Sequence, residues 1–334
     1  MSSKLFELKR KFTSLATANW ISRGQSIDPS IPGRNRLVAR TPGAVAGLLG
    51  QVITVLLFVG LLPITANAQG LNWEGQTGGF ITPFAYTAPS PSKGFGKPAV
   101  AFHFLNAGPV VGNYYNASLT VGLFGRVELG YTRSFNTEGS TIGLSPLFKG
   151  GFNIVHGKVN LLPENTAKKN YLPALSVGFV ARTNVQHVGG VLAGKGTTNG
   201  DLYIVATKTI TQTKGLPIVL NVGFKGTNTS VFGFAGNAPA WQGRFFGTGA
   251  IVVKGPAKST LIFGSEIVQQ PRSIQGLPGP TIPTTVTYIF RLIPAPETVH
   301  LNLDFGVAQA VGAIAPGVDI KARHQFAMGM TYWF

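Results

Sequence analysis

Apolar and polar residues alternate along short segments of the chain, which are separated by Gly, Pro and Asn. In residues 217–225, every second residue from Ile218 to Phe224 is apolar, and Asn221 and Lys225 belong to the opposite face. A period of two is that of a β-strand with one apolar face. The same pattern predicts strands at or near 99–106, 114–123, 126–135, 150–161, 172–182, 201–211, 243–253, 259–268, 284–292, 300–307 and 326–334. No segment after residue 68 has the length and period of an amphipathic helix, so the sequence predicts an all-β fold.

Two all-β architectures fit these segments: a soluble sandwich and a barrel closed in a membrane. The polar faces consist mainly of Gly, Ser, Thr and Asn, whereas the outer face of a soluble sandwich carries many charges. Segments of about ten residues match tilted membrane strands better than soluble ones. Both observations favour an antiparallel transmembrane β-barrel of about 12 strands (range 10–14). The alternation is ambiguous in 150–161, 201–211 and 243–253, and their register stays unassigned.

Aromatic residues gather near the ends of the predicted strands, where a membrane barrel has its aromatic girdles. The candidates are Tyr114, Tyr115, Phe135, Tyr171, Tyr203, Trp241, Tyr288, Tyr332 and Trp333. Gly- and Pro-rich stretches at 86–98, 189–200, 226–240 and 269–283 are the expected extracellular loops.

The composition changes this picture little. Only 12% of the residues are charged, against about a quarter in soluble domains, which also favours a membrane environment. The chain has no cysteine, and its histidines are scattered without ligand-like spacing, so we expect neither a metal nor another cofactor. The scattered histidines are His103, His156, His187 and His324.

The first 68 residues differ from the rest. They contain eight basic and two acidic residues, then the uncharged apolar stretch 43–64, and finally the small residues Ala66 and Ala68. This order is typical of a secretory signal peptide cleaved after Ala68, which leaves residues 69–334 as the barrel domain. An uncleaved membrane anchor is the alternative, because an apolar run of this length can span a bilayer. The basic lead is also similar to an organelle transit peptide.

Residues 69–334 keep 20 of the 28 basic and 9 of the 11 acidic residues, and so carry a formal charge of +11. A basic exported protein favours anionic lipid headgroups, acidic polysaccharide or small anions. Nucleic acid is not an expected partner, because no cluster of Lys and Arg is interleaved with aromatic residues.

The signal segment, the Gly-rich alternating strands and the aromatic last strand resemble a Gram-negative outer-membrane β-barrel. The resemblance implies a place in the cell outer membrane, in contact with its lipid. It also implies that Phe334, Tyr332 and Met330 form the signal that the barrel-assembly machinery reads.

Two short stretches carry a second resemblance. Residues 78–88 (GGFITPFAYTA) and 121–131 (VGLFGRVELGY) are similar to poorly characterised exported barrel families, including some associated with exopolysaccharide secretion loci. This resemblance implies components of polysaccharide export as partners.

Charged residues inside the predicted strands are candidates for the barrel interior, because Arg or Lys facing lipid at mid-depth costs about 2–4 kcal/mol. These candidates are Arg126, Glu128, Arg182, Lys225, Glu266, Arg291 and Asp304. They either neutralise one another in a plugged lumen or surround a narrow passage that weakly favours anions. The sequence leaves both arrangements open.

The sequence therefore indicates a porin-like or secretion-associated conduit for small or polyanionic solutes. The alternative is an occluded structural or binding barrel associated with exopolysaccharide export. An enzyme is not expected, because no Gly-x-Ser-x-Gly elbow is present. His300 and Asp304 share a strand face, but four residues span about 13 Å, beyond hydrogen-bond reach.

Overall fold

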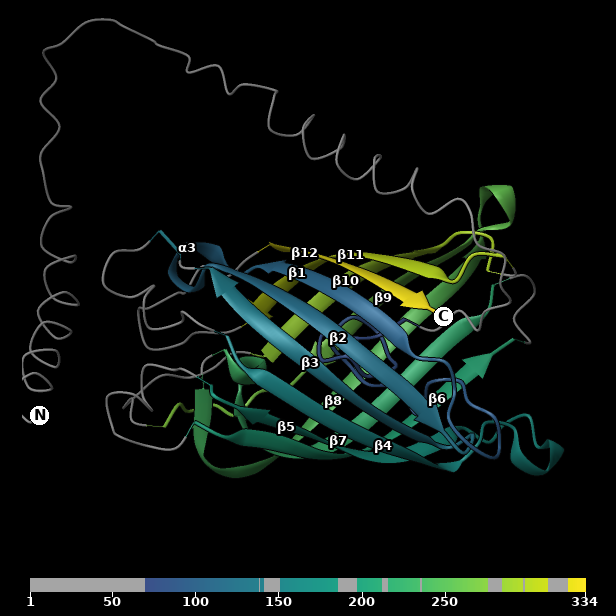
Figure 1. Ribbon diagram of the computed structural model, residues 1–334, viewed down its shortest axis with the longest axis horizontal. Helices are drawn as coiled ribbons and strands as arrows, with labels where there is room; N and C mark the ends of the chain where they lie inside the picture. The colour runs from purple at the N-terminus through teal and green to yellow at the C-terminus, as the bar shows by residue number, and fades with distance from the viewer. Residues whose placement is uncertain are drawn as a thin grey trace, which may run out of the picture. The chain divides into compact units, whose positions relative to one another are not determined.

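Twelve antiparallel strands form one closed barrel in the computed structural model (Figure 1). The structure describes residues 70–137, 139–140, 151–185, 197–211, 216–234, 236–275, 284–296, 298–311 and 324–334. The predicted signal segment, with its cleavage residues Ala66 and Ala68, lies outside the described residues, as does His187.

The strands follow one another around the barrel in sequence order, and β12 pairs with β1 to close the sheet. Their bounds are β1 Ala99–Asn106, β2 Asn113–Leu123, β3 Val127–Thr137, β4 Asn153–Leu162, β5 Ala174–Thr183, β6 Asn199–Ile210, β7 Ile218–Ser230, β8 Gly236–Lys254, β9 Thr260–Val268, β10 Thr284–Ile293, β11 Leu301–Val311 and β12 Gln325–Trp333. Among the described residues of the connections, four short helical turns are present: α3 Gly108–Val111, η2 Thr166–Lys168, η3 Val231–Gly233 and η4 Pro256–Lys258. The predicted fold class and number of strands are confirmed. Among the described residues, no helix has the length and apolar character needed to cross a membrane.

Side chains alternate between the two faces of this sheet. In β3, for example, Leu129 and Tyr131 are exposed outside, while Glu128 and Thr132, on either side of them along the strand, are fully buried inside. On the described strands, Arg133 and Lys208 are the charged residues that face outward, and both lie toward strand ends. An apolar outer band of this kind matches the hydrocarbon core of a bilayer.

The barrel has two unlike ends. Both Ala99, where β1 begins, and Phe334 lie at one of them, which we call the terminal end. The connections between strands there have 3 to 11 residues, whereas four of the six at the opposite end have 13 or 15. The shortest connection, between β2 and β3, turns at Phe124 and Gly125, both with positive φ (53° and 69°), as a tight hairpin requires.

Several predictions about loops and aromatic residues were wrong. Residues 226–240 are not a loop, because β7 and β8 extend through most of this range. Residues 86–98 do not connect two strands but lead from the lumen to β1 at the terminal end. Most of 189–200 lies outside the described residues. Of the predicted girdle, Tyr114, Tyr203 and Trp333 are buried and face inward, because their positions in the alternation put them on the lumen side.

Candidate functional site inside the barrel

The described chain begins inside the barrel. Residues 70–88, which we call the inserted segment, lie in the lumen and leave it through residues 89–98 (dark purple-blue in Figure 1). Residues 70–82 are all buried. The inserted segment and the wall therefore fill the lumen at this level.

Two tight turns shape the inserted segment. In the first, the side-chain oxygen of Asn72 accepts hydrogen bonds from the backbone N–H groups of Glu74 (3.0 Å) and Gln76 (2.9 Å). Gly75 supplies the positive φ (88°) that this turn requires. In the second, the N–H of Gly79 donates to the carbonyl of Thr82 (3.0 Å). These turns satisfy backbone groups that would otherwise be buried without partners.

The second turn holds the carboxylate of Glu266. The N–H groups of Phe80, Ile81 and Thr82 donate to its oxygens at 3.0, 2.9 and 3.1 Å, and the Thr82 hydroxyl donates at 2.6 Å. Successive backbone amides in a turn make an anion-binding concavity. A Cβ atom at Gly79 would collide with Oε1 of Glu266, so a larger residue here would force the carboxylate away from the amides that it binds.

A second carboxylate of the wall, that of Glu128, binds the inserted segment at two places, Thr77 and Ala88. It accepts hydrogen bonds from the N–H of Thr77 (3.1 Å), the Thr77 hydroxyl and the N–H of Ala88 (2.8 Å). Lys158 lies 3.1 Å from Glu128, and its ammonium also donates to the carbonyls of Thr77 (3.0 Å) and Phe84 (3.1 Å). The pair therefore joins β3 and β4 to the inserted segment.

Arg291 and Asp304 form a bidentate ion pair between β10 and β11, with N–O distances of 2.6 and 3.1 Å. The remaining guanidinium N–H groups donate to the carbonyls of Gly78 (3.0 Å) and Gly79 (3.1 Å). A fork of this geometry is the strongest common form of ion pair. It fixes the turn that surrounds Glu266.

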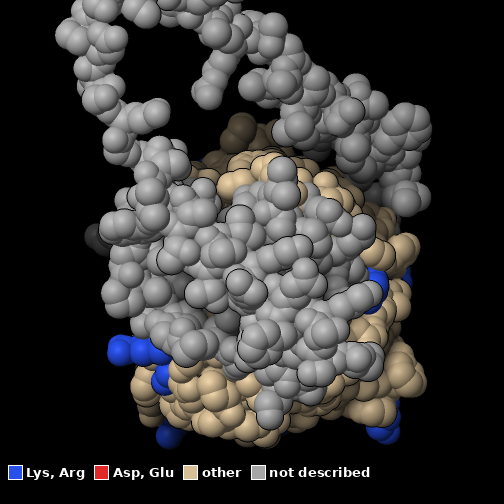
Figure 2. Space-filling view, turned by 90° about the vertical axis from the view of Figure 1, so that its left-hand side faces the viewer, with Lys and Arg blue, Asp and Glu red and all other residues tan. Residues whose placement is uncertain are grey.

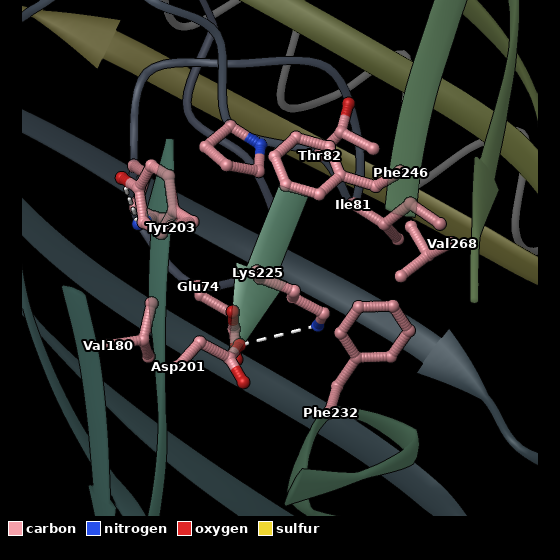
Figure 3. A pocket seen from close by; sticks show the side chains of 12 residues that line it. Glu74, Ile81, Thr82, Val180, Asp201, Tyr203, Lys225, Phe232, Phe246 and Val268 are labelled. Carbon is pink, nitrogen blue, oxygen red and sulfur yellow. Dashed lines mark hydrogen bonds and ion pairs between the residues drawn. The ribbon is translucent and has the colours of Figure 1, made fainter. Parts of the chain in front are cut away.

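A third cluster contains the carboxylate of the inserted segment itself. Arg182 donates to Glu74 (2.6 Å), Asp201 (2.9 Å) and Thr229 (2.9 Å). Lys225 lies 3.4 Å from Asp201 and 5.5 Å from the centroid of the Phe232 ring. A cavity of about 20 Å3 adjoins this cluster (Figure 3). That volume is enough for about one water molecule.

The inner face of the barrel wall has a band of polar residues around its whole circumference and an apolar region toward one end. Every strand contributes at least one buried polar residue: His103, Thr120, Thr132, Asn160, Ser176, Thr207, Asn221, Thr248, Glu266, Thr287, Asn302 and Thr331. Toward the opposite end, Trp73 and Phe80 of the inserted segment pack in a cluster with Tyr114 of β2 and Phe234 of the β7–β8 connection. The lumen thus combines a polar girdle with an aromatic core.

Tyr86 fastens the segment near the terminal end. Its hydroxyl donates to Glu164 (2.8 Å) and lies 2.9 Å from the hydroxyl of Thr209. Burial raises the pKa of the Tyr86 phenol, and the hydrogen bond to Glu164 acts in the same direction. The phenol therefore stays protonated and keeps this donor at physiological pH.

Six of the seven predicted interior residues are buried inside the barrel: Glu128, Arg182, Lys225, Glu266, Arg291 and Asp304. They occupy separate clusters instead of one ring. Arg126 does not belong to them, because it is exposed in the β2–β3 turn, where its side chain donates to the carbonyl of Leu161 (3.4 Å). It follows the tight hairpin and precedes the first residue of β3.

Sequence reasoning missed three buried charges. Lys158 and Asp201 lie in segments whose alternation was ambiguous, so no face was assigned to them. Glu74 precedes the first predicted strand. It is the only charged residue between Arg40 and Lys93 in the sequence, and this isolation is the signal that could have pointed to a buried partner.

Figure 2 looks onto the opposite end of the barrel. Among the described residues visible on that face, the charged side chains are Lys and Arg, and none is Asp or Glu. Five of the nine acidic residues in 69–334 are buried in the lumen instead: Glu74, Glu128, Asp201, Glu266 and Asp304. The excess positive charge therefore lies outside the lumen.

A closed antiparallel barrel with an apolar exterior and a filled polar lumen defines the class of transmembrane β-barrels. The chain belongs to the family described as "Protein of unknown function (DUF3034)", whose sequence model matches residues 68–277. The match covers the inserted segment and strands β1 to β9.

No curated protein matches the chain. Similar solved structures include the KdgM porin (9% identity, 71% of this chain and 99% of that chain, TM-score 0.40) and the NanC porin (8%, 71% and 98%, 0.40). Another is the COG4313 outer membrane channel from Pseudomonas putida F1 (9%, 75% and 98%, 0.43).

Proposed function

We propose that this protein is an outer-membrane barrel that conducts small polar solutes when the inserted segment leaves the lumen. The observation that carries the proposal is the polar girdle, to which all twelve strands contribute. Hydroxyl, amide and charged side chains are the groups that line water-filled barrels. Most of the girdle now binds the inserted segment, so the conformation described here is the closed one.

The attachment of the inserted segment supports a gating role. One connection, residues 89–98, joins it to β1. If the signal segment is cleaved after Ala68, the inserted segment begins at a free N-terminus and can leave without opening a second loop. The family match, which starts at residue 68, agrees with this boundary.

The charges of the wall bear on the choice of solute. The buried wall residues include four basic and four acidic side chains: Lys158, Arg182, Lys225, Arg291, Glu128, Asp201, Glu266 and Asp304. A balanced wall selects weakly by charge, so we propose small polar solutes and not polyanions. We propose no covalent chemistry; among the described residues, no three His, Asp or Glu side chains are placed to hold a metal ion.

We further propose that the barrel lies in the outer membrane and that its assembly machinery reads Phe334, Tyr332 and Met330. The apolar outer band and the closed sheet support a membrane location. The position of β12 supports the second point, because Met330 and Tyr332 face outward on the strand that closes the barrel.

Planar-bilayer recordings test the gate. The full mature chain is expected to be silent at rest, and a variant lacking residues 70–88 is expected to conduct. A synthetic peptide with the sequence of residues 69–88 should close the variant again. The same peptide carrying Gly79→Val is the matched control, because the added side chain collides with Glu266 and prevents seating. A correctly folded deletion variant that stays silent would refute the conduit.

The second candidate is an occluded structural or binding barrel, and the aromatic core favours it. Trp73 and Phe80 are almost fully buried in that core, and withdrawing them would expose a large apolar area to water. In this case the deletion variant loses stability without gaining conductance. An association with polysaccharide export is then a property of the outer surface and loops.

A further inference from the structure

Withdrawal of the inserted segment would not leave the cations of the wall in equal states. Lys158 keeps Glu128 of the wall as its ion-pair partner (3.1 Å), and Arg291 keeps Asp304 (2.6 Å). What these two cations would lose are hydrogen bonds to backbone carbonyls of the inserted segment. Both therefore stay neutralised by the wall in an open lumen.

Arg182 differs, because its partner in the inserted segment is a carboxylate. Oε1 of Glu74 lies 2.6 Å from Nε and 2.5 Å from Nη2 of Arg182. The guanidinium also donates to two residues of the wall, Asp201 (2.9 Å) and Thr229 (2.9 Å). These two bonds hold the side chain in its present orientation when Glu74 leaves, while the Nε edge loses the oxygen that it now binds.

The charge of this cluster changes at the same time. Arg182 and Lys225 are its two cations, and Asp201, which binds both, is the carboxylate of the wall. Glu74 supplies the second negative charge. Its departure leaves the wall part of the cluster with one excess positive charge. Inside a lumen with low-dielectric walls, such an excess strongly attracts a counter-ion.

A phenol lies beside these cations. Tyr203 of β6 pairs directly with Lys225 of β7, and both side chains face the lumen. The Tyr203 hydroxyl accepts a hydrogen bond from Gln76 of the inserted segment (2.8 Å) and would be released with it. Glu74, Tyr203 and Lys225 border the same small cavity (Figure 3). The wall thus offers a guanidinium edge, an ammonium and a phenol to a small polar anion.

We propose that Arg182 and Lys225 form a carboxylate-binding site of the lumen, which Glu74 occupies in the closed barrel and a small monocarboxylate solute occupies in the open one. The inference rests on the proposed conduit and adds a class of solute to it. One carboxylate is favoured over several, because Glu266 would lose the amides and the hydroxyl that bind it and would repel further negative charge.

Chemical rescue in the full mature chain tests the site. Glu74→Ala removes a CH2–COO− group, whose free equivalent is acetate, and keeps the rest of the inserted segment. Acetate that replaces chloride at constant ionic strength should stabilise this variant against urea in a saturable way. At ten times its Kd, it should lower the ratio of unfolded to folded protein about elevenfold. Acetamide has the same shape without the charge and should have no such effect.

Glu74→Gln is the matched control, because it removes the same charge but keeps the site filled with a neutral amide. This variant and the wild type should not respond to acetate, and Glu74→Ala/Arg182→Met should lose the response. Heat-modifiable gel migration checks that each variant is folded. If Glu74→Ala folds poorly, its folding yield should rise with acetate and not with acetamide. Equal responses of the Ala and Gln variants, or equal effects of the two ligands, would overturn the site.

Planar-bilayer recordings of the full chain with Gly79→Val extend the test to transport. Gluconate should reduce the potassium chloride current in a saturable way, whereas sorbitol, an uncharged molecule of similar size, should not. Adding Arg182→Gln should weaken the block about tenfold or more, the scale of one charged hydrogen bond. Arg291→Gln removes the same charge from the same lumen and should weaken it much less.

The two experiments fail separately. Equal losses of the gluconate block in the two arginine variants would mean that the total charge of the lumen acts, and would overturn the site. A conducting barrel whose Glu74→Ala variant ignores acetate would also overturn the site and leave the conduit intact. A silent Gly79→Val barrel together with rescue by acetate would leave the carboxylate contact at Arg182 intact and count against the conduit.

Discussion

The two faces of the same strands follow different rules. On the outer face, large apolar side chains such as Val222 and Phe245 are more than half exposed, and their environment is the bilayer. On the inner face, charges such as Glu128 and Arg291 are almost fully buried and make several hydrogen bonds each. The stability of the outer face therefore depends on how apolar its residues are, and the stability of the inner face depends on the particular partner of each residue.

This difference predicts how each face tolerates change. A residue that faces lipid makes no specific contact, so any apolar side chain of suitable size can replace it. A buried charge that loses its partner keeps the full cost of its desolvation. The same substitution should therefore have unlike effects on the two faces.

The largest effect is expected from adding one side chain at the turn that binds Glu266. Gly79→Val should unseat the inserted segment and give the conductance of the deletion variant, because the new Cβ collides with the carboxylate. Gly249→Val adds the same side chain to the outer face, in open space, and should leave the barrel closed. Planar-bilayer recordings distinguish them, and a silent Gly79→Val barrel would contradict the role of this turn.

The next largest effect is expected from Arg291→Met. It should lower the free energy of unfolding by about 3–5 kcal/mol, because Asp304 stays buried without its ion-pair partner. Urea unfolding in lipid vesicles measures it. The double variant Arg291→Met/Asp304→Asn should recover most of the loss, since it removes the uncompensated charge. If the single and double variants are equally unstable, the ion pair is not the cause.

On the outer face, introducing a charge should lower the free energy of unfolding less than Arg291→Met does, but more than replacing one apolar residue with another. Val222 lies within β7 with 61% of its surface exposed. Val222→Arg should lower the free energy of unfolding in vesicles by about 2–4 kcal/mol. Val222→Leu should be nearly neutral. Equal stability of the two variants would mean that Val222 does not face lipid.

Removal of Phe334 should have the smallest effect on the folded barrel. The residue is half exposed, donates its N–H to the carbonyl of Pro98 (3.2 Å) and packs edge-on against Tyr332. The free energy of unfolding should change by about 1 kcal/mol or less. The yield of inserted barrel in cells should fall much more, if the assembly machinery reads this residue. An unchanged yield would argue against that role.

The strands were predictable because their signal is local. Alternation within a few residues gave all twelve segments, and in β3 and β7 it gave the correct face for residues such as Glu128 and Lys225. The prediction from alternation failed where a turn interrupts the strand pattern. Arg126 continues the pattern of β3 by one step, but the tight turn at Phe124 and Gly125 places it outside the strand.

The content of the lumen was not predictable in this way. The inserted segment shows no sustained alternation, so nothing in residues 70–88 indicated where its apolar side chains would lie. Its partners are also far away along the chain. Glu266 binds amides 184 to 186 residues before it, and the Leu71 amide donates to Thr331, 260 residues later.

The sequence by itself determined the all-β fold, the approximate strand number and the lipid-facing side of the clearly alternating strands, because each follows from a short repeat and from the cost of placing charge in hydrocarbon. Only the tertiary structure decided that the lumen is filled and which charges meet there. Closing the barrel brings residues of all twelve strands around one segment, and hydrogen bonds and ion pairs depend on that three-dimensional proximity and not on sequence spacing.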